Sequence, residues 1–248
     1  MAKPVGTRIR EPRRKDGDGK RREAKDFNVA QRPAASRKAS GGGLALAKAA
    51  YALSVHDPRE LPRPGAPEIA FAGRSNAGKS SAINTLTGRR RLAFVSKTPG
   101  RTQLINFFSL GAEAFLVDLP GYGYADAPGE VRSHWKMLVG DYIASRPSLA
   151  AVVIVMDARH PLTPLDRQLI EWLRDAERPA HVLLTKADKL SKQAAQVTLA
   201  KVRKELAVLC PGSTAQLFSS LKAQGIDEAA RTLSRLAARK NKAPPKGE

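Results

Sequence analysis

The residues with the clearest chemistry form one short segment that follows an apolar stretch. Residues 73–80 read GRSNAGKS, which fits the pattern G-x-x-x-x-G-K-[ST]. In such a loop the glycines let the backbone wrap a diphosphate, and N–H groups at the start of the next helix attract its oxygens. Lys79 adds a point charge at the outer phosphates, and the Ser80 hydroxyl suits Mg²⁺. The pattern predicts a phosphate-binding loop, but it leaves open which nucleotide binds and whether phosphate is transferred or hydrolysed. The loop consists of Gly73, Arg74, Ser75, Asn76, Ala77, Gly78, Lys79 and Ser80.

A second group of candidate residues lies at the end of a later apolar stretch. It reads Asp118-Leu119-Pro120-Gly121 and follows residues 114–117. An Asp at the carboxyl end of a parallel strand faces the ligand crevice of an α/β sheet, where it can hold a metal-bound water. Gly121 would let its backbone N–H approach a terminal phosphate. The tetrapeptide by itself is equally consistent with a strand-ending turn, so its place after the phosphate loop carries the interpretation.

Between these two segments lies a threonine-containing turn, residues 98–103, with the sequence TPGRTQ. A threonine hydroxyl here could reach Mg²⁺ only when a γ-phosphate is present, and this would order the loop. Thr102 directly precedes a predicted strand and is our candidate. Thr98 is the alternative, and a plain Pro-Gly turn remains the non-functional explanation.

A third group predicts which base is recognised. Thr185-Lys186-Ala187-Asp188 follows an apolar strand pattern. A carboxylate accepts two hydrogen bonds from the N1–H and N2–H₂ edge of guanine, and adenine lacks that donor pair. The stem of Lys186 can cover the base. Backbone N–H groups of Phe218, Ser219 and Ser220 could point at guanine O6, although these residues also suit a helix-capping turn. The group favours GTP over the ATP of a kinase or ATPase.

Hydrophobic periodicity supplies the elements that position these residues. Strands and helices alternate, which predicts an α/β fold with a mostly parallel six-stranded sheet and helices on both faces. The stretch from Leu44 to Leu53 has apolar residues at helical spacing and predicts a short packed helix. The expected strands are Glu68–Ala72, Gln103–Leu110, Ala114–Asp118, Ala151–Asp157, His181–Thr185 and Ala215–Ser219. The expected helices are Lys79–Leu86, Val131–Ser145, Leu165–Glu177, Ser191–Leu206 and Gly225–Arg239.

The charge and the cysteine content of the chain indicate which partners and which compartment to expect. Lys and Arg total 43 against 23 Asp and Glu, a net charge of +20, which favours an anionic partner. Residues 1–43 are basic, lack periodicity and are expected to be a disordered tail, either a solubilising leader or an RNA-binding arm. Residues 44–239 form the predicted domain, and 240–248 are expected to fray. A single cysteine, Cys210, excludes a disulfide framework. No apolar run predicts a membrane helix, so we expect a cytoplasmic protein without membrane insertion.

Taken in order, these motifs resemble the five guanine-nucleotide-binding boxes of Ras-like GTPases. The strings GRSNAGKSS, KTPGRTQLINFF, DLPGYGYA and TKADKL are similar to those of the bacterial EngB (YsxC/YihA) family, in the TrmE-Era-EngA-EngB-Septin-like class. The resemblance spans about residues 44–240. It implies a P-loop NTPase with a Ras-like G domain that hydrolyses GTP to GDP and phosphate. It also implies a monomer that acts in assembly of the large ribosomal subunit, with the precursor's rRNA and ribosomal proteins as partners. Normal cell division and septation are expected to depend on it.

The resemblance also implies site residues. Mg²⁺ is placed on Ser80 and Thr102, and the catalytic candidates are Lys79, Asn76, Thr102 and Gly121. Beyond residues 73–80, the implied nucleotide contacts are Gly100, Arg101, Thr102, Gln103, Leu104, Asp118, Leu119, Pro120, Gly121, Thr185, Lys186, Ala187, Asp188, Phe218, Ser219 and Ser220.

Departures from the commonest GTPase pattern predict altered chemistry. Thr185 stands where most GTPases have Asn, so a strap from this side chain to the phosphate loop is expected to be weaker or absent. Tyr122 stands where Ras-type enzymes have a water-positioning Gln, so hydrolysis should be slow. Asn76 occupies the position that some related GTPases use to bind K⁺, which predicts K⁺ stimulation. An RNA- or protein-binding module with a mainly structural nucleotide is the alternative function.

Overall fold

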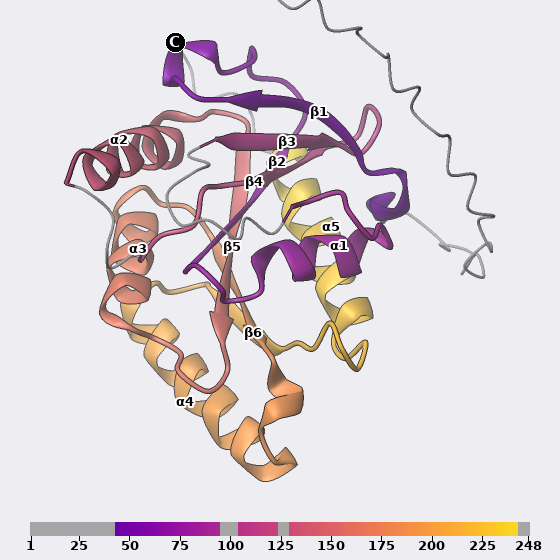
Figure 1. Ribbon diagram of the computed structural model, residues 1–248, viewed down its shortest axis with the longest axis vertical. Coiled ribbons are helices and arrows are strands. Elements are labelled where there is room, and N and C mark those ends of the chain that lie inside the picture. The colour runs from indigo at the N-terminus through magenta and orange to yellow at the C-terminus, as the bar shows by residue number, and fades with distance from the viewer. Residues whose placement is uncertain (1–42, 95–103, 124–128, 243–248) are drawn as a thin grey trace, which may run out of the picture. The chain divides into compact units, whose positions relative to one another are not determined.

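A seven-stranded sheet runs through the part of the chain that the computed structural model describes. The described residues are 43–94, 104–123 and 129–242, with only the backbone described for 129–134 and 240–242. The strand order is β1-β3-β4-β2-β5-β6-β7 (Figure 1). The strands are β1 Ala50–Val55, β2 Glu68–Gly73, β3 Ile105–Ser109, β4 Phe115–Asp118, β5 Leu149–Asp157, β6 Ala180–Thr185 and β7 Thr214–Leu217.

Five of these strands are parallel and two are not. β4, β2, β5, β6 and β7 run in one direction, whereas β3 is antiparallel to β4 and β1 is antiparallel to β3. The predicted α/β class with a mostly parallel sheet is therefore confirmed. Because the carboxyl ends of the parallel strands meet at one edge, the loops that follow them lie together.

The prediction for residues 44–53 was wrong, and it accounts for the seventh strand. Leu46–Lys48 form one 3-10 turn, η1, and Ala50–Val55 pair with β3 instead of continuing as a helix. A short run of alanine and leucine satisfies a helical period and a strand period equally, so periodicity could not decide. Pairing with β3, which lies about fifty residues later in the chain, overrides the local preference.

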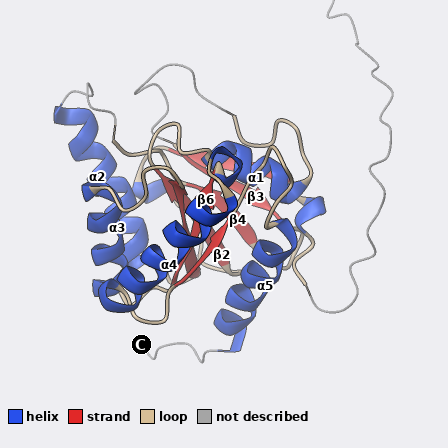
Figure 2. Cartoon of the chain, turned by 90° about the horizontal axis from the view of Figure 1, so that it is seen from below, coloured by secondary structure: helices blue, strands red, loops and turns tan. Residues whose placement is uncertain are grey.

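Helices cover both faces of the sheet, as predicted (Figure 2). α2 Gly129–Ser145, α3 Pro164–Asp175 and α4 Lys192–Leu209 pack on one face. α1 Lys79–Thr87 and α5 Ile226–Lys242 pack on the other, together with η1. All nine residues of β5 are buried between the two layers, which agrees with its nearly continuous apolar sequence and the β-branched run at residues 152–155.

Candidate nucleotide-binding site

A cavity of about 1000 Å³ opens at the carboxyl edge of the parallel strands. The phosphate loop forms one wall, the turn after β4 forms another, and Lys186 comes from the loop after β6. Leu104 lines the same cavity, whereas Thr98, Gly100, Arg101, Thr102 and Gln103 lie outside the described residues. The structure thus brings three of the predicted motifs to one cavity: the phosphate loop, the turn after β4 and the loop after β6.

Backbone geometry shapes the phosphate loop. Gly73 ends β2 so close to β5 that an added Cβ would lie 2.7 Å from the Val155 carbonyl oxygen. Asn76 and Gly78 have φ values of 63° and 100°, and α1 begins directly afterwards at Lys79. The first N–H groups of a helix have no acceptor within the helix. Here they belong to residues that line the cavity, so the loop presents donors suited to phosphate oxygens.

Two opposite charges of the site pair with each other across the cavity wall. The Lys79 ammonium forms an ion pair with Asp118 Oδ1, and the two side chains are 13% and 7% exposed. Both residues line the cavity. The charge expected at the phosphates and the carboxylate expected near the metal therefore neutralise each other in this arrangement.

The oxygen atoms at this edge of the sheet suit Mg²⁺ as ligands. Ser80 and Asp118 offer hard oxygen atoms to the same cavity, and the Ser80 hydroxyl donates to the Phe94 carbonyl at 3.1 Å. Within the described ranges, no group of three or more His, Cys, Asp or Glu side chains is arranged to hold a metal. Mg²⁺ commonly keeps waters and takes ligands from a bound phosphate, so one hydroxyl and one nearby carboxylate fit its requirements.

Thr185 was expected to give a strap to the phosphate loop that is weaker or absent, and the structure shows that the strap is not absent. Its hydroxyl oxygen lies 2.5 Å from the Ala77 carbonyl and 3.0 Å from the Met156 carbonyl, and the residue is buried. The shorter side chain reaches the phosphate loop because β6 ends against it. The strap to the loop is therefore present.

Lys186 fastens the same loop from a different side. Its ammonium donates to the Asn76 carbonyl at 2.7 Å and lies 3.0 Å from Asp157 Oδ2. Burial raises the pKa of Asp157, but hydrogen bonds from Arg159 and Lys186 outweigh it and hold this pKa below its usual range. Asp157 and Arg159 were not singled out in the sequence. Like Asp118, Asp157 ends a parallel strand, and this signal could have marked it.

The loops after β6 and β7 meet at the predicted base reader. Ser219 Oγ donates to Asp188 Oδ1 at 2.5 Å, which joins the two motifs. The N–H of Phe218 donates to Leu184, and that of Ser219 donates to Gln224. These two donors were expected to face guanine O6, but the strand ladder and the following turn use them. Among the described hydrogen bonds, none uses the N–H of Ser220, the remaining candidate donor.

Several predicted contacts can involve only the backbone. The side chains of Ala77, Leu119, Ala187 and Phe218 are buried in the core, with 4% exposure or less. Leu119 donates its N–H to Phe71, so this turn continues the β2 pairing before it reaches Gly121.

Comparison with known proteins places the chain in a family. Residues 68–186 match the family model described as a 50S ribosome-binding GTPase. The chain is 58% identical over 187 residues to a probable GTP-binding protein EngB from Methylobacillus flagellatus, which covers 75% of this chain and 90% of the relative. A relative of the same name from Nitrosomonas europaea is 57% identical over 185 residues, or 75% of this chain and 83% of the relative. This chain belongs to the EngB family of GTP-binding proteins.

Solved structures agree on the fold. A crystal structure of a probable GTP-binding protein engB aligns with a TM-score of 0.53 and 22% identity, over 69% of this chain and 99% of that one. A variant of Era from Aquifex aeolicus bound to GDP·AlF₄⁻ aligns with a TM-score of 0.55 and 19% identity, over 74% of this chain and 58% of that one.

EngB-type proteins are P-loop GTPases, which hydrolyse GTP, and this chain is a GTPase of that type. No helix in the described ranges combines the length and apolarity that a bilayer crossing requires.

Tyr122 shows how this EngB-family site differs from a Ras-type one. The phenol is 5% exposed and donates to Asp166 Oδ1 at 2.7 Å, in the first turn of α3. Burial and the negative charge of Asp166 raise the pKa of Tyr122 well above its usual value, so the hydroxyl stays protonated. Its ring meets Trp135 edge-on, and the Trp135 indole N–H donates to the Pro120 carbonyl at 2.8 Å. The side chain that follows Gly121 therefore anchors the turn to the helices instead of facing the cavity.

Proposed function

We propose that this chain is a GTP-dependent switch in assembly of the large ribosomal subunit, and that normal cell division and septation depend on it. The ion pair between Lys79 and Asp118 carries the proposal. A bound nucleotide needs both charges, so its binding has to separate a pair that now satisfies itself. The site then has one arrangement without nucleotide and another with it, and the γ-phosphate contacts proposed for Thr102 and Gly121 would separate the GTP form from the GDP form. The description of the matching family model supports a ribosomal partner.

Each motif has a place in the proposed complex. The phosphates contact residues 73–80, the γ-phosphate is sensed by Thr102 and Gly121, and Asp188 holds guanine. Ser80 and Thr102 are the proposed Mg²⁺ ligands. The proposed partners are a large-subunit precursor and its rRNA, and the protein acts as a cytoplasmic monomer.

The chain's own groups account for a slow reaction. Lys79 and the N–H groups at the start of α1 stabilise negative charge on the phosphates. Mg²⁺, when bound, adds to this neutralisation. The residue after Gly121 is Tyr122, which has no side-chain amide to orient a water, and its phenol is turned toward Asp166. Hydrolysis without a partner is therefore slow.

K⁺ is the proposed activator at Asn76. This residue lines the cavity in a left-handed conformation, and its backbone carbonyl is held by Lys186. That leaves the side-chain oxygen as the ligand for a monovalent cation beside the phosphates. Turnover should be faster in KCl than in NaCl at the same ionic strength, and equal turnover would contradict this role.

Sedimentation with purified large-subunit precursor particles tests the switch. The full chain should co-sediment with the particles in a non-hydrolysable GTP analogue and remain largely free in GDP. Lys79→Ala should lose the difference between the two nucleotides, while Lys192→Ala, an exposed lysine at the start of α4, should keep it. Equal co-sedimentation of the native chain in both nucleotides would reject the switch.

A further inference from the structure

One surface beside the cavity combines exposed positive charge with exposed aromatic rings. Arg89, Arg90 and Arg91 follow α1, and all three are exposed. Phe94 is 78% exposed, and Tyr51 on β1 is 61% exposed. We call these five residues the arginine–aromatic surface. Large rings that remain in water beside a cluster of charge indicate an interaction site.

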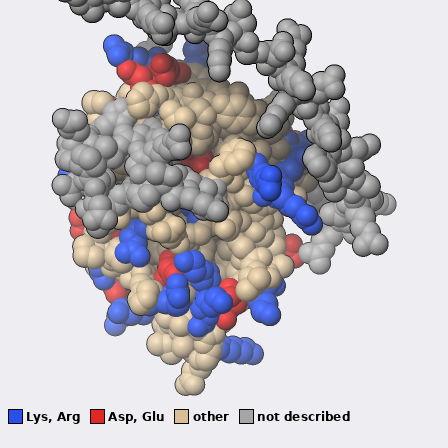
Figure 3. Space-filling model, viewed as in Figure 1, with Lys and Arg blue, Asp and Glu red and all other residues tan. Residues whose placement is uncertain are grey.

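Contacts bring the two segments of this surface together. Arg89 Nη2 donates to the carbonyl of Ala47, in the turn just before β1, at 3.1 Å. Tyr51, Arg91 and Phe94 line the same cavity. Among the ion pairs between described residues, none involves Arg89, Arg90 or Arg91. Figure 3 shows Lys and Arg side chains at the top, at the right and over the lower part of the face that it draws, with Asp and Glu side chains among them.

The chemistry of the surface selects its partner. Unpaired guanidinium groups attract the phosphates of a polyanion. Exposed aromatic rings stack on bases, but only on bases that are free of a duplex. We propose that the arginine–aromatic surface binds an unpaired RNA segment, with phosphates on the arginines and bases on Tyr51 and Phe94. The inference rests on the proposed ribosomal function and names the part of the chain that contacts the RNA.

The surface borders the nucleotide cavity, and one hydrogen bond joins it to the phosphate loop. Ser80, the proposed Mg²⁺ ligand, donates its hydroxyl to the Phe94 carbonyl at 3.1 Å. Mg²⁺ bound at Ser80 would compete with this hydrogen bond to the Phe94 backbone. RNA affinity should therefore differ between the nucleotide-free protein and the protein with Mg²⁺ and a bound nucleotide.

Fluorescence anisotropy with a labelled single-stranded oligoadenylate tests the proposal on the full chain. Phe94→Ala should weaken binding about 10-fold without changing its salt dependence, because it removes stacking. Arg90→Glu should weaken binding and lower the slope of log affinity against log salt by about one. Arg90 does not line the cavity, so GDP affinity should remain as in the native chain.

The exposed side of α4 offers matched controls. Val208 is 78% exposed, like Phe94, and Lys204 is an exposed cation. Val208→Ala and Lys204→Glu should leave RNA binding unchanged. Losses equal to those of Phe94→Ala and Arg90→Glu would overturn the assigned surface, and equal affinity for a duplex of the same length would overturn unpaired RNA as the ligand.

Particle sedimentation separates this inference from the proposed function. If the two surface variants weaken particle binding but not oligoadenylate binding, the partner is a protein and the RNA assignment fails. If they weaken oligoadenylate binding while the native chain sediments with particles equally in GDP and the GTP analogue, the surface stands and the switch fails.

Discussion

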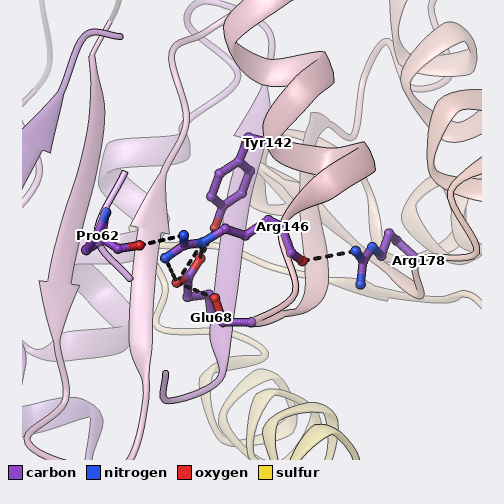
Figure 4. A network of polar contacts seen from close by, with 6 residues as sticks. Pro62, Glu68, Tyr142, Arg146 and Arg178 are labelled. Carbon is purple, nitrogen blue, oxygen red and sulfur yellow. Dashed lines mark hydrogen bonds and ion pairs between the residues drawn. The ribbon is translucent and has the colours of Figure 1, made fainter. Parts of the chain in front are cut away.

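The two ends of β2 carry buried ion pairs of opposite character. At its amino end, Glu68 meets Arg146, and the side chains are 2% and 5% exposed. Tyr142 and Ser148 donate to the same carboxylate at 2.7 Å each, and Arg146 also donates to the Pro62 carbonyl at 2.7 Å (Figure 4). The network satisfies both oxygens of Glu68, as a buried charge requires.

At the carboxyl end, the pair between Lys79 and Asp118 has far fewer partners. The described hydrogen bonds give these two side chains one contact, with each other, beside a cavity of about 1000 Å³. A ligand that brings its own charges can replace such a pair, whereas Glu68 and Arg146 are buried and do not line the cavity. The same fold therefore uses a pair of opposite charges in two ways, as a permanent stabilising contact at one end of β2 and as a replaceable contact at the other.

Breaking the permanent pair should have the largest effect. Arg146→Ala leaves Glu68 buried without its cation, and the free energy of unfolding should fall by about 3–5 kcal/mol. Urea denaturation of the nucleotide-free protein measures it. Arg174→Ala removes a pair with Asp175 whose side chains are 48% and 64% exposed, and its loss should be much smaller. Similar losses for both variants would mean that burial does not distinguish the pairs.

Acid should lower the stability of the folded chain through a buried histidine that lies away from the cavity. His181 is buried between Thr214 and Gln216 in β7, and burial lowers its pKa to about 4. The unfolded chain binds a proton near pH 6.5, so stability is full above that pH and is lost as pH falls toward 4. The loss should approach roughly 3 kcal/mol. Denaturation curves measured at several pH values give the free energy of unfolding as a function of pH. This dependence should be shallower for His181→Gln than for the native chain, and an unchanged dependence would exclude His181 as its source.

The sequence predicted the carboxyl end of the sheet better than the amino end. Phosphate loops and strand-ending carboxylates are local patterns, so Lys79 and Asp118 could be assigned to this edge in advance, and both line the cavity. The partners of Glu68 lie more than seventy residues away, and no local spacing joins them. For the same reason β1 was taken for a helix, because its partner strand is distant. Contacts that depend on long-range pairing remained out of reach.

Opening the replaceable pair should affect binding more than stability. Lys79→Ala should weaken GDP affinity about 10- to 100-fold, because a charged contact to phosphate is lost. The nucleotide-free protein should lose only about 1–2 kcal/mol, since Asp118 can turn to water in the cavity. Titration with a fluorescent GDP and urea denaturation give the two values. A stability loss as large as that of Arg146→Ala would remove the contrast between the two ends.

The smallest effect should come from Tyr122→Phe, which tests whether the turn after Asp118 is anchored or catalytic. The substitution keeps the ring against Trp135 and removes the bond to Asp166 Oδ1, whose other oxygen still accepts from Thr163 at 2.8 Å. Stability should fall by about 1 kcal/mol. Single-turnover GTP hydrolysis should keep its rate, because the phenol faces α3 and not the cavity. A tenfold slower reaction would show instead that the hydroxyl acts on the nucleotide, and Tyr122 would then be a catalytic residue and not an anchor of the turn.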